Sequence, residues 1–361
     1  MMTETINLPV FDGHNDILED IYSSSNPLDH RAFLEGKDGH LDLPRARRAG
    51  FKGGFFAVYP PNHPHIPPAK DRLIETDEGY YVPFPPPLDF DYARDAAAAM
   101  IDLIHRIASH SLGDFQVVQD YQELERCFQG GVMAAVLHLE GAEPILPDLS
   151  NLEHYLDRGV RSIGITWSRP NAFGHGVPFQ TPSSPDTGPG LTAAGKELVR
   201  VCNQRGVMID LAHLNEQGFW DAAEISTAPL VSSHTAANAL IQRARNLTDD
   251  QLQAVADSEG VVGVIFSVND LDGGIRPKAD APLSAIVRHI TYIAELVGVE
   301  HVAFGSDLDG TVIPSEFGDV EGFPRLLTAF KEAGFNQEEL EKISWRNWFR
   351  VLKDTWHGGE A

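Results

Sequence analysis

The stretch that decides the fold is "LTAAGKELVRVCNQRGVMIDLAH", residues 191–213, in which a capped helix leads directly into a short apolar strand. Thr192 is a residue type that caps helix N-termini and Gly206 is one that ends helices, so the pattern predicts a helix over residues 191–205. The run 207–213 is apolar and rich in strand-forming residues. Helices that alternate with buried strands indicate a parallel sheet.

The same alternation recurs along the chain. The segment "NLTDDQLQAVADSEG" repeats the pattern with Gly260 as its stop. Further helices are predicted at residues 92–109, 249–258, 285–297 and 323–333. Strands are predicted at residues 9–14, 53–59, 133–139, 162–167, 207–213, 230–234, 261–267 and 301–306. Eight such units favour one closed (β/α)8 barrel domain of the TIM type over residues 1–361. An open, doubly wound sheet is the alternative, weakened because no G-x-G-x-x-G fingerprint follows the first strand.

Residues 60–89 interrupt this alternation with the segment "PPNHPHIPPAKDRLIETDEGYYVPFPPPLD". Its prolines exclude a long helix. Its length predicts an insertion loop that crosses the barrel mouth or forms a dimer contact, rather than a short connection. We interpret His63 and His65 within it as surface histidines.

Composition limits the partners and the location of the protein. With 28 basic and 52 acidic residues, the formal net charge is −24, which disfavours binding to nucleic acid or to anionic lipid. Cys127 and Cys202 are interpreted as small buried thiols, because two cysteines make no disulfide framework. The sequence shows no signal-peptide pattern and no apolar run of about 18 residues. We therefore expect a cytoplasmic protein without membrane contact, and a homodimer.

Six titratable side chains stand at the C-terminal ends of predicted strands, where a (β/α)8 barrel builds its active site. They are His14, Asp16, Glu140, His213, His234 and Asp307. Each has a simpler explanation: His14 lies within a turn, His213 and His234 are core residues, Asp16 and Glu140 are helix caps, and Asp307 is a turn residue. All of these explanations would have to hold together, so we favour a metal site.

Imidazole and carboxylate ligands suit zinc, and also manganese or iron. Five ligands are too many for one tetrahedral zinc with an open position, so the set predicts two metals that share Glu140 as a bridge. A hydroxide held between the metals would attack an amide or ester, and Asp307 would act as the general base. Arg245, with Asn246 beside it, follows the sixth strand. A guanidinium there is suited to binding a substrate carboxylate, and the alternative is that it solvates a helix start.

Six separated motifs occur in order along the chain and together carry a family resemblance. They are "DGHND", "DLPRARRAG", "LHLEGAEP", "LTAAGKELVRVCNQRGVMIDLAH", "SSHTAANA…RARN" and "FGSDLDG". Together they resemble the membrane (renal) dipeptidase family of the amidohydrolase superfamily, from about residue 11 to about residue 351. The resemblance implies a (β/α)8 barrel with two Zn²⁺ per chain. It also implies hydrolysis of dipeptides, L-Xaa-D-Xaa or L-Xaa-L-Xaa.

The resemblance also implies a role for each candidate residue. The implied ligands are His14 with Asp16 on one zinc, His213 with His234 on the other, and Glu140 as the bridge. It further implies that Asp307 handles the proton and that Arg245 binds the substrate carboxylate.

The fourth-strand motif departs from the family. Better-known members carry a histidine after the threonine, where "GITWSRPNAFGHG" has Trp167. We expect Trp167 to contact substrate and carbonyl polarisation to rest more on the metals, with His175 either a replacement or a plain loop residue. Two alternative functions stay open: hydrolysis of N-acyl amino acids or lactones, and non-catalytic metal binding. Arg245 argues for a substrate with a free carboxylate, and Asp307 argues against a non-catalytic protein.

Overall fold

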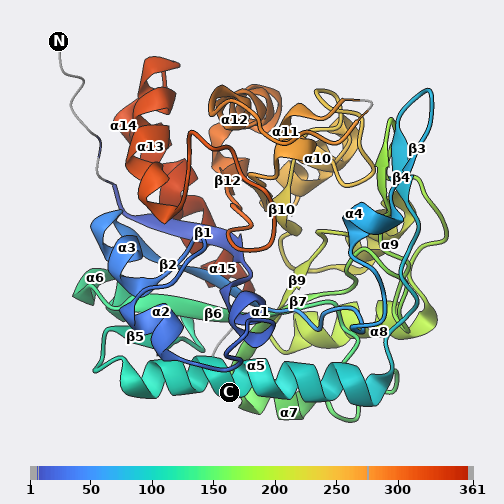
Figure 1. Cartoon of the computed structure of the whole chain (residues 1–361), viewed down its shortest axis with the longest axis horizontal. Coiled ribbons are helices and arrows are strands. Elements are labelled where there is room, and N and C mark those ends of the chain that lie inside the picture. The colour runs from blue at the N-terminus through green and yellow to red at the C-terminus, as the bar shows by residue number, and fades with distance from the viewer. Residues whose placement is uncertain (1–5, 7, 275, 357–361) are drawn as a thin grey trace.

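The computed structural model describes residues 6, 8–274 and 276–356. Eight parallel strands form a barrel at its centre, and their order in the sheet follows their order in the chain (Figure 1). They are β1 (Val10–Asn15), β2 (Phe51–Val58), β6 (Met133–Glu140), β7 (Val160–Gly164), β9 (Met208–Asp210), β10 (Val231–Thr235), β11 (Val261–Val264) and β12 (Val302–Phe304). A ninth strand, β5 (Phe115–Val117), pairs in parallel with the first three residues of β6.

The segment after β12 closes the barrel against β1. Asn15 and Leu308 form a parallel bridge, and the Asp16 amide donates to the Leu308 carbonyl oxygen at 2.8 Å. The amide and hydroxyl of Ser306 also donate to the Asp12 carboxylate, at 2.8 and 2.6 Å. The prediction of a (β/α)8 barrel is therefore confirmed, and the open sheet is wrong.

Helices cover the outside of the barrel. In Figure 1, α5 runs along the lower edge of the molecule, and α10 and α12 lie in its upper part. They are α1 (Ile17–Tyr22), α2 (Arg31–Glu35), α3 (Leu43–Arg48), α4 (Ala69–Arg72), α5 (Phe90–His110), α6 (Tyr121–Gly130), α7 (Leu152–Asp157), α8 (Ala193–Gln204), α9 (Glu216–Ile225), α10 (Asp249–Asp257), α11 (Val268–Asp272), α12 (Ser284–Val297), α13 (Phe323–Glu332), α14 (Gln337–Glu341) and α15 (Asn347–Thr355). The five predicted helices correspond to α5, α8, α10, α12 and α13. No helix in the described part of the chain combines the length and the apolar character needed to cross a membrane.

Helix ends follow the expected chemistry in one case and differ in another. The Thr192 hydroxyl accepts the third backbone N–H of its helix at 3.1 Å, and Gly206 has a left-handed φ of 61°. After α10 the left-handed residue is Glu259, with φ 58°, so the prediction that Gly260 stops this helix is wrong. A Cβ on Gly260 would lie 1.9 Å from the Leu230 carbonyl oxygen. Glycine is required at this position because the backbone at Leu230, just before β10, passes too close for a side chain.

The helix α15 closes the N-terminal end of the barrel. Trp348 on this helix is fully buried inside the strands, and its indole N–H donates to the Phe304 carbonyl oxygen at 2.9 Å. A Cβ on Gly13 would lie 2.4 Å from the Trp348 ring, so the barrel is narrow at this level. Cys127 and Cys202 are buried free thiols, as predicted. With one end filled, the polar site lies at the C-terminal end.

The insertion 60–89 forms part of the barrel mouth, as one of the two interpretations predicted. It contains the short helix α4 and the strands β3 (Ile74–Glu75) and β4 (Tyr80–Val82). β4 pairs antiparallel with β8 (Phe179–Thr181), which makes a three-stranded sheet at the right of Figure 1. Tyr80 and Val82 of β4 line the central cavity. His63 contacts Asp89 at 3.1 Å and lies outside that cavity, in agreement with a surface histidine.

Candidate metal centre

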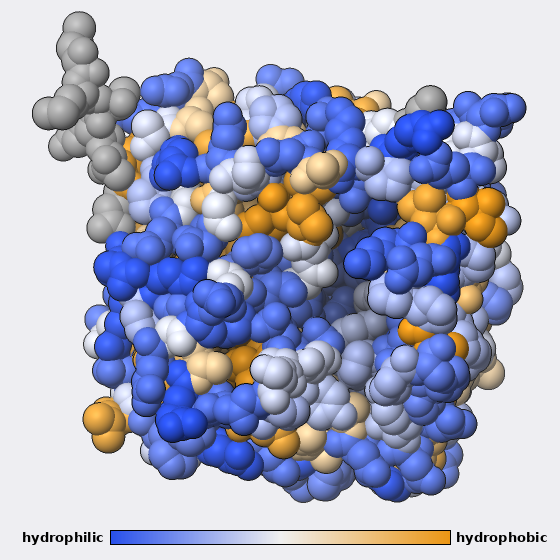
Figure 2. Space-filling model, in the orientation of Figure 1, coloured by the Kyte–Doolittle hydropathy of each residue, from blue (hydrophilic) through white to orange (hydrophobic). Residues whose placement is uncertain are grey.

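A cavity of about 510 Å³ opens at the C-terminal end of the barrel, seen as a hollow right of centre in Figure 2. Its lining includes Asp16, Glu140, His213, Arg245 and Asp307. These residues end or follow different strands, and the closure of the barrel brings them together. Much of the surface around the hollow is hydrophilic. Five of the predicted site residues therefore line one cavity.

Glu140, the last residue of β6, holds its two carboxylate oxygens toward different histidines. Its Oε2 lies 3.5 Å from His14 Nε2, whereas its Oε1 lies 3.2 Å from His213 Nε2 and 3.6 Å from His234 Nε2. Two groups with metal-ligating geometry share this carboxylate: Glu140 with His14 and Asp16, and Glu140 with His213 and His234. One buried carboxylate thus faces two sets of donors, which is the arrangement expected of a bridging ligand.

Hydrogen bonds fix the tautomer of His234. The Ser233 hydroxyl donates to Asp210 Oδ2 at 2.5 Å and lies 2.8 Å from His234 Nδ1. Because that hydroxyl is already a donor, His234 Nδ1–H must donate to it, which leaves Nε2 with a lone pair. His213 Nδ1 contacts the Ser168 hydroxyl at 2.8 Å, and the two Nε2 atoms lie 2.9 Å apart. The Nε2 lone pair of His234 is thus directed at the His213 ring, and a cation between the two Nε2 atoms would replace this close contact.

The charge states of these imidazoles suit metal binding. Burial lowers the pKa of His213 to about 4, and the nearby guanidinium of Arg245 adds to this effect. Burial also lowers the pKa of His234 well below its usual range, with His14 and Arg245 as further causes. Both rings are therefore neutral near pH 7, and the neutral ring is the form that binds metal.

The first donor set contains buried atoms without partners. Both ring nitrogens of His14 and Oδ1 of Asp16 have no hydrogen bond, and His14 Nε2 lies 3.4 Å from Asp16 Oδ2. Asp16 stands at the N-cap position of α1 but makes no capping hydrogen bond, so the simpler helix-cap explanation is wrong. Burial alone would lower the pKa of His14, but the Glu140 and Asp16 carboxylates outweigh it and raise that pKa. Buried nitrogen and oxygen atoms without hydrogen-bond partners, as in His14 and Asp16, are suited to binding a divalent cation.

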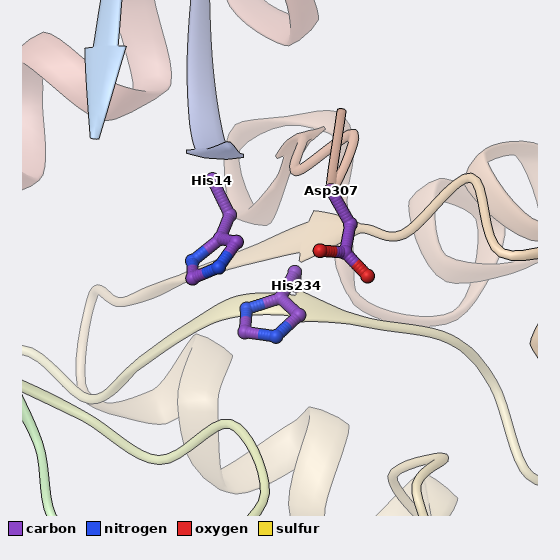
Figure 3. A group of neighbouring side chains, drawn as sticks. All are labelled: His14, His234 and Asp307. Carbon is purple, nitrogen blue, oxygen red and sulfur yellow. The ribbon is translucent and has the colours of Figure 1, made fainter. Parts of the chain in front are cut away.

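Asp307 lies beside both sets. It follows β12 with a left-handed φ of 61°, and its amide donates to the His14 carbonyl oxygen at 3.0 Å. Figure 3 shows its carboxylate facing the same space as the rings of His14 and His234, and one ligand atom of each lies within 4.8 Å of the others. Burial and then the Asp16 carboxylate raise the pKa of Asp307 well above its usual range. Sparsely populated backbone conformations of this kind cluster at functional sites.

Arg245 and Asn246 have different surroundings. Arg245 lines the cavity and donates from Nη2 to the His234 carbonyl oxygen at 2.9 Å. The nearby carboxylate of Asp270 is paired with Arg243 at 2.6 Å, which leaves the Arg245 guanidinium available to a ligand. Asn246 is fully buried, donates to two backbone carbonyls at 3.0 Å, and is not among the described residues that line the cavity. Its amide holds the loop behind Arg245, and this position gives the predicted substrate contact no support.

Trp167 belongs to an aromatic wall of the cavity. Its ring lies 5.1 Å from that of Tyr59, 5.6 Å from that of Phe179 and 5.8 Å from that of His213. His175 is partly buried and is not among the described cavity-lining residues, so it does not replace the family's histidine there. The wall supplies apolar surface beside the polar centre.

Two residues that support the site were not predicted. Arg169 is fully buried, pairs with Glu143 at 2.7 Å, and lies over the rings of Tyr59 and Trp167 at 5.2 and 5.1 Å. No sequence signal distinguished it from a surface arginine. His138 had a signal, because it stands two residues before Glu140 and shares its strand face. Its ring lies 5.5 Å from that of His14.

Comparisons with known proteins identify the family of the chain. The family model of the membrane dipeptidases, peptidase family M19, matches residues 4–358. The chain belongs to the membrane dipeptidase family. A metallopeptidase from Rhodobacter sphaeroides, solved with a phosphinate mimic of the dipeptide L-Ala-D-Ala, is 40% identical with a TM-score of 0.92, over 98% of this chain and 100% of that one. The solved M19 metallopeptidase called dipeptidase AC is 39% identical with a TM-score of 0.90, over 97% and 99% of the chains.

A curated relative from a fungus is also similar to this chain. Dipeptidase ataJ of Aspergillus terreus is 30% identical over 96% of this chain and 84% of its own length. The predicted family is confirmed, and with it a metallopeptidase of the dipeptidase class on an amidohydrolase barrel.

Proposed function

We propose that this member of the family is a binuclear zinc dipeptidase that cleaves dipeptides with a free C-terminal carboxylate. Its substrates are L-Xaa-D-Xaa or L-Xaa-L-Xaa. The observation that carries the proposal is the carboxylate of Glu140, whose two oxygens face separate imidazole sets. The relative solved with a mimic of L-Ala-D-Ala supports the substrate class.

The donor set would be completed by two divalent cations, which when bound supply activation of water and polarisation of the scissile carbonyl. His14 and Asp16 would hold one cation, and His213 and His234 the other. Asp307 would take the proton of the attacking water on its carboxylate and pass it to the leaving amine. Burial beside Asp16 raises the pKa of Asp307, which makes its carboxylate a stronger acceptor for that proton.

The substrate would be positioned from both sides of the centre. Arg245 would bind the C-terminal carboxylate, which lies one residue beyond the scissile bond of a dipeptide. One fixed cation thereby measures the length of the substrate. Trp167 and Tyr59 would cover the peptide and reduce access of bulk water, which strengthens electrostatic interactions in the site.

The proposal is tested by screening zinc-loaded protein against L,L- and L,D-dipeptides, their amides, N-acyl amino acids and lactones. Free dipeptides should have the highest kcat/KM. Preference for N-acyl amino acids or lactones would assign one of the alternative reactions to the same centre. No turnover of any compound would indicate a non-catalytic metal-binding protein.

A further inference from the structure

Glu19 is a cavity-lining carboxylate that the proposed mechanism does not use. It stands in the first turn of α1 and belongs to none of the three groups that can hold a metal ion. Its side-chain hydrogen bond is with the Ser23 hydroxyl, which donates to Oε1 at 2.5 Å. Glu19 is therefore free to contact a ligand in the cavity.

Within the described residues, no lysine or arginine side chain forms an ion pair with Glu19. Lys37 pairs with Asp20 at 2.6 Å and Arg169 pairs with Glu143 at 2.7 Å. Lys70 lines the same cavity but is exposed, and no ion pair joins it to Glu19 within the described residues. The carboxylate therefore lacks a cationic partner of its own.

The surroundings of Glu19 favour a cation. Burial raises the pKa of its carboxyl to about 7, and the carboxylates of Asp16 and Asp20 add to the rise although the Ser23 hydroxyl opposes it. An opposite charge within a few ångströms would stabilise the ionised form. A positively charged ligand group is therefore better suited to this wall than a neutral or acidic one.

Glu19 and Arg245 stand on different sides of the cavity. Glu19 follows β1, whereas Arg245 follows β10, and the barrel order places β11 and β12 between these strands. The Glu140 carboxylate acts on the pKa of both Glu19 and Arg245, so this candidate ligand lies near each of them. A dipeptide with its C-terminal carboxylate on Arg245 and its scissile bond at the centre directs its N-terminal residue toward the side of Glu19.

We propose that Glu19 selects dipeptides whose N-terminal residue has a basic side chain, lysine or arginine. The inference rests on the proposed dipeptidase function. The cavity of about 510 Å³ has room for a long side chain, and Tyr59 lines it together with Glu19. Long basic side chains place their methylene stems on apolar surface and their charge on a polar partner, and this wall provides both.

The test compares lysyl-alanine with norleucyl-alanine, which has a similar stem and no charge. The C-terminal alanine has whichever configuration the enzyme hydrolyses. For zinc-loaded wild type, kcat/KM should favour lysine by about tenfold, the order expected of a charge-assisted contact. In Glu19→Gln, which retains an acceptor for Ser23, the ratio should fall to about one. Glu75→Gln is the matched control, because Glu75 lines the same cavity but is exposed and pairs with Arg276.

Each outcome decides the proposal. Loss of the preference in Glu19→Gln but not in Glu75→Gln supports it. No preference in wild type overturns it, and so does an equal loss on both substrates, which would assign Glu19 to the α-ammonium group. Turnover of norleucyl-alanine shows that the dipeptidase function holds even if the lysine preference fails. Absence of turnover on both dipeptides would overturn the proposed function, and this inference with it.

Discussion

Replacing Arg245 with alanine separates two roles of its guanidinium. One Nη2–H donates to the His234 carbonyl oxygen at 2.9 Å, and Arg245 also lines the cavity. Loss of the first contact affects every substrate by the same factor, because it loosens the backbone of a candidate ligand. Loss of a charge-assisted contact to a substrate carboxylate costs about 1.5–3 kcal/mol. The second loss is about ten- to 150-fold in kcat/KM and applies only to substrates that carry the carboxylate.

The assay is a double cycle of enzyme and substrate, with kcat/KM measured for a dipeptide and its C-terminal amide. Arg245→Ala should lower kcat/KM for the acid by the product of both factors, and kcat/KM for the amide by the factor common to all substrates alone. Arg245→Lys should recover only part of the loss, because an ammonium cannot make a paired contact. Arg276→Gln is the control for general charge, since Arg276 is exposed. Equal losses on acid and amide would refute carboxylate recognition and leave Arg245 a structural residue.

Three other substitutions test separate parts of the site. Asp307→Asn should retain both metals yet lower kcat by about 10²–10⁴-fold, and retention of more than half of the wild-type kcat would rule out proton transfer by Asp307. His213→Ala should leave about one metal per chain by elemental analysis, because one donor set loses an imidazole; two tightly bound ions would exclude His213 as a ligand. Arg169→Met should leave the Glu143 charge buried and unpaired, which costs about 3–5 kcal/mol and lowers the melting temperature by several degrees. An unchanged melting temperature would show that this ion pair does not stabilise the fold.

The barrel and its site were predictable because one physical rule connects them. Parallel strands in a closed barrel direct their C-terminal ends to one pocket, so His14, Glu140 and His234 could be grouped from their places at strand ends. The prediction that Asp16 is a metal ligand needed the same argument from strand ends, because its local sequence fits a helix cap equally well. His138 could have been grouped with them by its alternation with Glu140.

Other features depended on contacts between distant segments. The pairing of β4 with β8 joins residues about 100 positions apart, and no local pattern predicts such a partner. Arg169 supports Tyr59 and Trp167 only through tertiary contacts. Gly260 was predicted to end a helix because glycine often follows helix C-termini. Its role is instead to leave space for the backbone at Leu230. The cytoplasmic location and the homodimer stay predictions.

The most direct test of the two-metal dipeptidase is a zinc titration of metal-free protein, with dipeptide hydrolysis as the readout. Because the two oxygens of Glu140 face separate donor sets, both sets should be needed for full activity. The account predicts that activity rises until about two equivalents of zinc per chain and then stays level. A plateau at one equivalent, or hydrolysis that needs no metal, would contradict it.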